Sequence, residues 1–591
     1  MAGSDTAQTF LSAFASSSHF AYASLVGLIV LVGNGLVFVL RTLRPKAFPP
    51  GPRGLPGLGN VLQLNRTWPF LTYGAWAKRY GADTPLGVKL GAKNVVVLNS
   101  GRAVRDLIEK RGAIYSDRPF FYMQNEYIFK HDLKPAIFQN YGPWLTRWRK
   151  EFTIFFGPQA IARLSPVYEA EAARLLVKMV EAMVKSPTGS LKGQHLEPFL
   201  MRWTISVPCL GVCGQRPDED SLGRYGFDIA AFKRCSDEFS DLIKPNAAEL
   251  FPILRRVPEF MGMARWKERA RNVREHCFKT GRQFISAAKD QRAALDGGKP
   301  IEWESILAKM LREQRDADAS GGHKDGSPEA YTTAEMGHTG FHIVASATAS
   351  SLAVMSTMLL LLAKYPDMQD RIRDEILTAS GGGPPRASQV AGWRFTEAFW
   401  NEMHRWRPVT PAGIPHAAAK DDVYEGHVIP KGTATLINVW NIHHAEEDYE
   451  HPERFDPERF LRHPFGMRLD EAHDPARLEA ASARVTWDFG AGRRICPGRH
   501  VAKQNLLLGL AGILWAFDVV PPPEAEGGVD AIDLSLERGF VQEIALTPKT
   551  LNFSLRLREG RTTVQEIMDH YAAAYEGEAK VMGWEDGRFK W

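Results

Sequence analysis

Near the C-terminus, a glycine-rich loop around a single cysteine limits the folds open to this chain more than any other segment. Residues 489–498 read FGAGRRICPG, with glycine at three of the ten positions. Glycine permits backbone conformations and close approaches that a Cβ would forbid. The apolar run at residues 501–510 predicts a helix, so Cys496 precedes a helix N-terminus, where the positive end of the dipole favours a thiolate. A thiolate fixed by such a loop is a suitable axial ligand for iron.

The loop matches the pattern F-x-x-G-x-R-x-C-x-G at all five specified positions. In this respect the chain resembles the cytochrome P-450 family, and especially its fungal microsomal members. The resemblance implies that Cys496 is the axial ligand of a haem b iron (iron protoporphyrin IX). It also implies that Phe489, Gly490 and Gly498 lie against this cofactor. A buried structural cysteine beside a turn is the alternative for a lone Cys, but it explains neither the arginine of the motif nor the glycines.

Composition indicates the compartment rather than the function. The net charge of 73 − 68 = +5 over 591 residues is a mild basic excess that does not by itself indicate a nucleic-acid partner. The five cysteines are odd in number and scattered, which argues against a disulfide framework and for a reducing compartment. Cys209 and Cys213 lie four apart, but no second Cys or His pair lies nearby to complete a zinc site, so core packing is the better interpretation.

The N-terminal segment is predicted to anchor the chain in a membrane. Residues 20–40 carry no charge, and at about 1.5 Å rise per residue they span about the thickness of a bilayer core. Residues 1–19 contain no Lys or Arg, whereas residues 41–60 are basic and rich in proline. The positive-inside rule then predicts a short lumenal N-terminus, one transmembrane anchor at residues 20–40, and a cytosolic domain on the endoplasmic reticulum. A cleaved signal peptide is the alternative, but it lacks its basic n-region here.

Residues 41–60 are too rich in proline for a helix and are stiff enough to orient a domain. The segment resembles the proline-rich hinge of microsomal members of the same family. We therefore expect it to set the position of the catalytic domain relative to the anchor.

A long central helix is predicted after Thr332, which has capping-box spacing to Glu335. Residues 341–363 are uncharged, so a second membrane span is the alternative. Against a second span stand His342 and six hydroxyl residues in the segment. It would also place Cys496 and the proline-rich hinge on opposite sides of the membrane. The sequence therefore favours a buried helix that crosses the whole domain.

In the family that the chain resembles, this helix crosses above the haem with the pattern A-G-x-(D/E)-T-T. Counted back from the helix-ending proline, the pattern falls on residues 346–351, which read SATASS. Ser350 then occupies the place of the alcohol that family members direct at the reacting dioxygen. Ala349 occupies the place of the acid and has no proton to give. A register error of one residue would bring Ser351 into this place, and an error of two residues Thr348, so Ser350 and Thr348 are the candidate catalytic residues. Water or substrate hydroxyls are the alternative proton source.

Glu402 and Arg405 lie three residues apart on one helix face and can pair. Such pairs are usually solvated, but aromatic and apolar neighbours predict burial, which requires further hydrogen bonds. Arg459 follows in a P-E-R-F segment, and the Cys496 loop comes after it. This order resembles the family's E-x-x-R, P-E-R-F and haem loop. The resemblance implies a structural triad of Glu402, Arg405 and Arg459 that holds the loop on the thiolate side.

Haem propionates are anions that need cationic or hydrogen-bonding partners. Arg494 occupies the arginine of the cysteine motif. The segment WLTRWR at residues 144–149 resembles the family's W-x-x-x-R helix imperfectly, because Arg149 fits but Leu145 stands where the tryptophan is expected. His416 stands where the family often places another propionate partner. A loop histidine satisfied by its own neighbours is an equal alternative for His416.

A strand, a turn and a second strand are predicted at residues 428–439, and a late strand at residues 552–557. The loops do not separate independent domains, because the matching motifs lie on both sides of them. We therefore assign residues 61–559 to one haem-thiolate catalytic domain. Residues 560–591 form a charged, aromatic C-terminal tail without a recognised role.

The resemblance covers residues 49–559 and implies a mainly α fold with small β-sheets, preceded by one N-terminal transmembrane helix. It implies a membrane-anchored monooxygenase that activates dioxygen and hydroxylates, epoxidises or desaturates a mostly apolar small molecule, in fungal secondary metabolism. Electrons would come from NADPH through a flavoprotein reductase, with cytochrome b5 as a further candidate partner. The missing acid at Ala349 leaves a redox-independent haem-thiolate isomerase or dehydratase open, and a non-catalytic haem sensor is a third alternative.

Overall fold

The computed structural model describes residues 22–584, apart from positions 23, 31, 134 and 559 and the segments 130–132, 245–246, 258–264, 320–330 and 469–483. Helices dominate the described part of the chain, with four small sheets beside them, which confirms the expected mainly α fold. The expected lumenal segment 1–19 lies outside the described residues.

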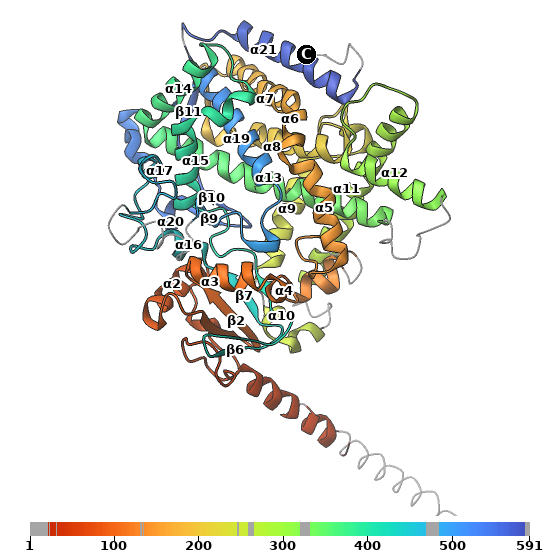
Figure 1. Cartoon of the computed structure of the whole chain (residues 1–591), viewed down its shortest axis with the longest axis vertical. Coiled ribbons are helices and arrows are strands. Elements are labelled where there is room, and N and C mark those ends of the chain that lie inside the picture. The colour runs from red at the N-terminus through yellow and green to blue at the C-terminus, as the bar shows by residue number, and fades with distance from the viewer. Residues whose placement is uncertain are drawn as a thin grey trace, which may run out of the picture.

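The helices and strands follow one another along the whole described chain (Figure 1). The α-helices are α2 (Pro69–Tyr80), α3 (Gly101–Val104), α4 (Gly112–Tyr115), α5 (Pro143–Phe156), α6 (Pro158–Arg163), α7 (Ser165–Lys185), α8 (Glu197–Cys213), α9 (Ile229–Ile243), α10 (Ala247–Leu250), α11 (Arg265–Asp296), α12 (Ile306–Ala319), α13 (Thr333–Lys364), α14 (Pro366–Ser380), α15 (Arg394–Trp406), α16 (Val439–His443), α17 (Glu458–Arg462), α19 (Arg499–Ala516), α20 (Leu536–Gly539) and α21 (Val564–Met582). The strands are β1 (Leu86–Leu90), β2 (Lys93–Leu98), β3 (Ser190–Lys192), β4 (His416–Ala417), β5 (Asp422–Tyr424), β6 (His427–Ile429), β7 (Ala434–Ile437), β8 (Phe517–Val520), β9 (Phe540–Gln542), β10 (Leu546–Pro548) and β11 (Ser554–Leu557).

The largest sheet has the order β1-β2-β7-β4, in which β2 and β7 run parallel with Val95 opposite Ala434. The two strands expected at residues 428–439 both form, but they do not pair with each other. β6 pairs with β5, whereas β7 joins β2 and β4. The four residues of β2 that pair with β7, at positions 95–98, are all buried, so β7 covers more apolar surface in the four-stranded sheet than in an isolated hairpin, which is marginally stable at best.

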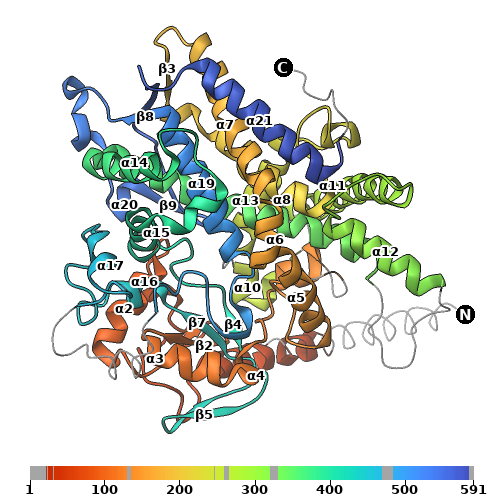
Figure 2. The same cartoon turned by 45° about the horizontal axis from the view of Figure 1, so that its top comes forward.

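Helix α13 runs through the centre of the molecule and packs against α8, α11, α12 and α19 (Figure 2). The capping box at its start is confirmed, because the Thr332 hydroxyl accepts from the Glu335 N–H while the Glu335 carboxylate accepts from the Thr332 N–H. In the most apolar window of α13, 61% of the residues are buried, against 6% in the N-terminal helix. The protein therefore buries α13 in its core and does not present it to a membrane.

A close glycine contact lets α13 cross α11. A Cβ built on Gly281 would lie 2.8 Å from the carbonyl carbon of Gly337, and a Cβ on Gly337 would lie 3.0 Å from that of Gly281. Side chains at either position would push the two helices apart. This contact fixes α11 against the half of α13 that precedes residues 346–351.

The N-terminal helix, Ser24–Thr42, projects away from the globular body (Figure 1). Most of its apolar side chains, among them Leu25, Ile29 and Leu36, are more than half exposed, a pattern typical of a helix surrounded by lipid. The proline-rich segment that follows is tied to the body by Arg44, whose guanidinium donates to the carbonyls of Gly51 (2.8 Å) and Gly87 (3.1 Å). Arg44 thus links the start of the proline-rich segment to Gly51 within the same segment, and it also ties the segment to strand β1.

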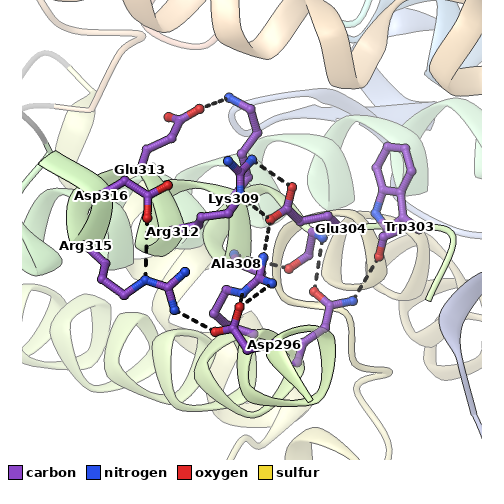
Figure 3. A network of polar contacts seen from close by, with 12 residues as sticks. Asp296, Trp303, Glu304, Ala308, Lys309, Arg312, Glu313, Arg315 and Asp316 are labelled. Atoms are coloured by element: carbon purple, nitrogen blue, oxygen red, sulfur yellow. Dashed lines mark hydrogen bonds and ion pairs between the residues drawn. The ribbon is translucent and has the colours of Figure 1, made fainter. Parts of the chain in front are cut away.

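An ion-pair network joins the end of α11 to the start of α12 (Figure 3). Glu304 accepts from Arg292 at 2.6 Å and from both Nε and Nη2 of Arg312, at 3.0 and 3.1 Å. Asp296 accepts from Arg292 and Arg315, each at 2.7 Å. These pairs hold α11 and α12 against each other beside α13.

The residues after position 560, for which the sequence indicates no role, form helix α21, which lies along α7 (Figures 1 and 2). Glu578 of α21 is fully buried and pairs with Arg216, which also donates to Glu171 of α7 at 2.5 Å. The Arg216 guanidinium also lies 4.7 Å from the ring centroid of Trp584. Most of the presumed tail is therefore part of the folded body, joined to it by buried charges.

Candidate active site

Backbone hydrogen bonds fix the cysteine loop between α17 and α19. The Cys496 N–H donates to the Phe489 carbonyl at 2.8 Å, and the Ile495 N–H donates to the Gly492 carbonyl at 3.2 Å. Gly490 and Gly492 have φ angles of +73° and +57°, a region that favours glycine. A Cβ on Gly492 would also lie 2.5 Å from the Ile108 carbonyl oxygen. The glycines thus serve both the turn and the close packing of the loop.

Cys496 lies immediately before α19, as the sequence predicts, with only Pro497 and the N-cap Gly498 between them. A Cβ on Gly498 would lie 4.0 Å from the Cys496 sulfur, so glycine leaves the space beside the sulfur open. Burial raises the pKa of the Cys496 thiol, while the Gly498 N–H and the charges of Arg149 and Arg499 act in the opposite direction. A bound cation is needed to hold this sulfur as a thiolate.

All five cysteines are free, but Cys496 is half-buried whereas the other four are buried. Burial raises the pKa of Cys209, Cys213 and Cys277 well above that of an ordinary thiol. These are inert packing residues, which agrees with the interpretation of Cys209 and Cys213 from the sequence. Only Cys496 keeps part of its surface accessible.

Two arginines from distant segments converge on the backbone beside this loop. Arg494 donates to the carbonyls of Ser116 (2.8 Å) and Ala136 (3.1 Å), and also to that of Gln139. Arg118 donates to the carbonyls of Ile137 (2.8 Å), Ile414 (3.0 Å) and Pro415 (2.6 Å). Burial and then the charges of Arg494 and Arg149 hold the pKa of Arg118 well below its usual value.

Arg149 of α5 reaches the cysteine loop itself, because its guanidinium donates to the Ile495 carbonyl at 2.6 Å. The tryptophan expected four residues before Arg149 is replaced by Leu145, which is buried in the core. Trp144, one residue earlier, packs edge-on against Tyr331 at 5.7 Å instead of filling that role. The imperfect W-x-x-x-R match therefore leaves only Arg149 at the loop.

His416 is the first residue of strand β4, and the charges of Arg118 and Arg494 act on its ring. Its Nδ1 bonds the Tyr115 carbonyl at 2.7 Å, so Nδ1 carries the proton in the neutral ring. Burial and then the charge of Arg118 lower the pKa of His416 to about 3. An anion bound nearby would offset that cationic field.

Glu402, Arg405 and Arg459 meet in one buried ion-pair cluster. Arg405 donates to Glu402 through Nε (2.7 Å) and Nη2 (2.8 Å), and the Nε of Arg459 lies 3.1 Å from the same carboxylate. Glu402 also accepts from the Asp456 N–H at 2.8 Å. Arg405 donates onward to the His443 carbonyl at 2.9 Å, which satisfies the hydrogen-bonding needs of a buried pair.

A second connection from α15 reaches the cysteine loop, and sequence reasoning missed it. His404 Nδ1 lies 2.6 Å from the Asp488 carboxylate, which also accepts from the N–H groups of Val409 (2.9 Å) and Thr410 (3.1 Å). The His404 ring lies 5.0 Å from that of Phe489. A histidine next to E-x-x-R and an acid next to the motif phenylalanine were the available signals.

Ser350 and Thr348 point to different sides of α13. Ser350 is half-buried, and its hydroxyl donates to the Ser346 carbonyl at 2.8 Å. Thr348 is buried, and its hydroxyl donates to the Val344 carbonyl at 2.7 Å. Ser346 is exposed although it lies midway along a central helix, so its face of α13 borders open space. Of the two candidates, Ser350 is the one on this open side.

Comparisons with known proteins agree with this geometry. The family model described as Cytochrome P-450 matches residues 49–538. Cytochrome P-450 monooxygenase grgG of a Penicillium species is 62% identical over 563 residues, covering 95% of this chain and 97% of the relative. Cytochrome P-450 monooxygenase 231 of Postia placenta is 29% identical over 552 residues, covering 88% and 91%. Cytochrome P-450 monooxygenase acuD of Aspergillus aculeatus is 27% identical over 542 residues, covering 90% and 93%.

The chain belongs to the cytochrome P-450 family. It is an oxidoreductase of the monooxygenase class that binds haem iron, and the three relatives named above are fungal. The expected family and fold are thereby confirmed.

The residues of this P-450 fit a haem. Arg118 and Arg494 are buried and Arg149 is half-buried. Burial, and then the charges within this group, lowers the pKa of Arg118 and of Arg494, and among the described residues none of the three has an ion-pair partner. Three uncompensated guanidiniums would be costly, and two propionates are the anions that would balance them. The open space beside the Cys496 sulfur is where iron would bind. Arg118 was missed from the sequence because it belongs to no motif that the chain presents.

Proposed function

We propose that this P-450 takes electrons from NADPH through a flavoprotein reductase and hydroxylates, epoxidises or desaturates a mostly apolar small molecule in fungal secondary metabolism. Cytochrome b5 is a further candidate partner. The observation that carries the proposal is the cluster of Arg118, Arg149 and Arg494 beside Cys496, which suits an anionic redox cofactor. The monooxygenase names of its fungal relatives support the same reaction class.

The residues of the chain divide the work of holding this cofactor. Haem, when bound, supplies the redox chemistry and the activation of dioxygen. Cys496 would ligate the iron, with Gly490 and Gly498 keeping the loop close and Phe489 packed beside it. Arg118, Arg149 and Arg494, with His416, would hold the propionates. The ion pairs of Glu402 and the His404–Asp488 pair would keep the loop rigid, so that the ligand geometry does not relax.

Proton delivery is the least conventional part of the proposal. Ser350 already donates its one hydroxyl proton to the backbone, so it can accept a hydrogen bond but must rotate to give one. Ala349 beside it cannot supply a proton. We propose that water in the open space at Ser346, or a hydroxyl of the substrate, replenishes Ser350.

The N-terminal helix is proposed as a single anchor in the endoplasmic reticulum membrane, with the catalytic domain cytosolic. Its length, its apolar composition and its exposed surface support this proposal. Phe38 of the helix lies 6.2 Å from Phe251, which follows α10, so the end of the anchor touches that part of the body. For the reductase, exposed Arg493 and Lys150 beside the cysteine loop form a suitable cationic surface.

The deciding experiment compares Cys496→Ala with Cys235→Ala, a buried cysteine of α9. Parent protein and Cys235→Ala should show the Soret band of thiolate ligation when reduced under carbon monoxide, and should consume NADPH when a P-450 reductase is added. Cys496→Ala should lose both. A parent protein that converts substrate without NADPH would instead support the isomerase or dehydratase alternative. An unchanged spectrum in Cys496→Ala would refute the proposal.

A further inference from the structure

Two buried histidines on α13 leave three of their four ring nitrogens without a hydrogen-bond partner among the described residues. His338 and His342 are 3% and 9% exposed. These three atoms are both ring nitrogens of His338 and the Nε2 of His342, and no described residue bonds to them. Buried polar groups in native proteins are nearly always satisfied, so three unsatisfied nitrogens in one place call for an explanation.

Aromatic rings enclose the pair. The Phe278 ring of α11 lies edge-on to His338 at 4.4 Å, and Phe129 lies edge-on to His342 at 5.1 Å. Phe239 of α9 lies 6.1 Å from His342. An imidazole N–H can point at a ring face, but that contact is weak and leaves the acceptor nitrogen unmet. The surrounding rings therefore do not account for the two imidazoles.

Both imidazoles are neutral at physiological pH. Burial, and then the charge of Arg274, lowers the pKa of His338 to about 4. Burial lowers the pKa of His342 well below its ordinary value, with His338 adding to the effect. A neutral imidazole carries one donor and one acceptor. The pair can therefore bind a group that both donates and accepts, without introducing a charge.

The position of the pair on α13 connects it to the candidate reaction centre. His338, His342, Ser346 and Ser350 are four residues apart in turn, so they share one stripe of the helix. Ser346 is exposed and Ser350 half-buried, so the stripe borders open space just beyond His342. At about 1.5 Å per residue, His342 lies about 6 Å from Ser346 and about 12 Å from Ser350 along the axis.

We infer that His338 and His342 form a polar anchor for the substrate, binding a hydroxyl or carbonyl oxygen on an otherwise aromatic or aliphatic molecule. This inference rests on the proposed function, because it takes Ser350 to mark the reaction centre. The phenylalanines pack the apolar surface of the molecule, and the imidazoles select for the oxygen. The carbon that is oxidised then lies about one to two helical turns, roughly 6–12 Å, from that oxygen.

The test uses two probes that differ by one hydroxyl, naphthalene and 2-naphthol. Calorimetric titration of the haem-loaded protein gives the dissociation constant of each probe for the parent, for His342→Phe and for His342→Asn. The parent should prefer 2-naphthol at least tenfold, as expected for a hydrogen bond in a desolvated site. His342→Phe should lose about tenfold of that preference without weaker binding of naphthalene, and His342→Asn should retain part of it.

His570→Phe is the matched control, because His570 is also buried but packs against Trp515 of α19, away from the stripe. It should leave the preference of the parent unchanged. Equal binding of the two probes by the parent, or an unchanged ratio in His342→Phe, would overturn the inference. The carbon monoxide spectrum of each variant is recorded separately, so a failure of haem ligation would be seen as failure of the proposed function instead.

Discussion

Arg118 shows how a single residue can matter to a site without belonging to a motif. It donates three hydrogen bonds to carbonyls of two segments, residues 137 and 414–415, that approach each other only in the folded chain. Burial, and then the charge of nearby Arg494, lowers the pKa of Arg118 well below its usual value. An anion between these arginines would relieve that repulsion, which makes Arg118 a residue that both organises and binds.

We expect Arg118→Ala to weaken haem retention about tenfold or more, because charged hydrogen bonds contribute about 1.5–3 kcal/mol each. Arg118→Lys keeps the charge but not the planar fork, and should recover only part of the loss. Haem content after dilution, measured by absorbance, checks this. Arg224→Ala, at an exposed arginine after α8, is the control and should behave like the parent. Full haem retention in Arg118→Ala would remove Arg118 from the site.

The two hydroxyls of α13 give a second residue-scale prediction. Ser350→Ala should lower the product formed per NADPH and raise peroxide release, because a relay without an acid behind it is already weak. Thr348→Val removes a hydroxyl that is bonded to Val344 on the buried side, so coupling should stay the same. Product, peroxide and NADPH are measured together. If Thr348→Val uncouples the enzyme and Ser350→Ala does not, the register of the helix pattern is off by two residues.

Among single residues, those that lie within a recognisable motif could be predicted from the sequence. Cys496 and Arg494 lie in a dense motif, and the structure places both at one loop. Arg118 and the His404–Asp488 pair could not be named, because each acts through contacts with residues many positions away. The partial W-x-x-x-R match shows the limit of a motif, since Leu145 stands at the tryptophan position and only Arg149 reaches the loop.

At the scale of elements, burial decides what an ion pair contributes. Glu402 is fully buried and holds two arginines, whereas Glu458 of α17 pairs with Arg371 on the surface. Breaking a buried pair leaves an uncompensated charge, while an exposed pair is screened by solvent. The two carboxylates therefore make a matched comparison within one region.

We expect Glu402→Gln to cost about 3–5 kcal/mol of unfolding free energy and to reduce haem incorporation. Glu458→Gln should change stability by less than about 1 kcal/mol. Urea unfolding followed by tryptophan fluorescence, with the carbon monoxide spectrum alongside, measures both effects. Similar costs for the two variants would show that α15 and α17 do not depend on this pair.

Elements with strong local signals were predictable, and their partners were not. The capping box and apolar run gave α13, and the run after Cys496 gave α19. Strands β6 and β7 were predicted as neighbours, but β7 pairs with β2, more than 330 residues earlier. Sheet partners depend on which apolar faces meet in the folded chain, and a local pattern of residues carries no such information.

At the scale of the whole molecule, helix α21 near the C-terminus packs against α7, and a buried cluster of charged side chains joins the two helices. Arg216 lies between Glu171 and Glu578, both fully buried. The nearby guanidiniums outweigh burial and lower the pKa of Glu171, whereas burial raises the pKa of Glu578 above that of an ordinary carboxyl, to about 8. The charged, aromatic composition of residues 560–591 did not reveal this, because the partners of Glu578 lie more than 350 residues earlier.

Because the pKa values of Glu171 and Glu578 shift in opposite directions, we expect substitutions of the two residues to differ in their effect on stability. Burial raises the pKa of Glu578 to about 8, so we expect Glu578 to hold a proton in its contact with Arg216 at pH 7 and Glu578→Gln to cost little. Glu171→Gln removes the charge that balances Arg216 and should cost about 3–5 kcal/mol.

Because the pKa of Glu578 is higher in the folded state, its proton stabilises the fold fully below about pH 4.5 and is lost as the pH rises through about 8. The parent should therefore lose stability from pH 6 to 9, and Glu578→Gln should flatten that slope. Thermal unfolding across this range decides the matter, and equal costs for the two variants, or a slope that Glu578→Gln leaves intact, would show that Glu578 is ionised in the folded protein.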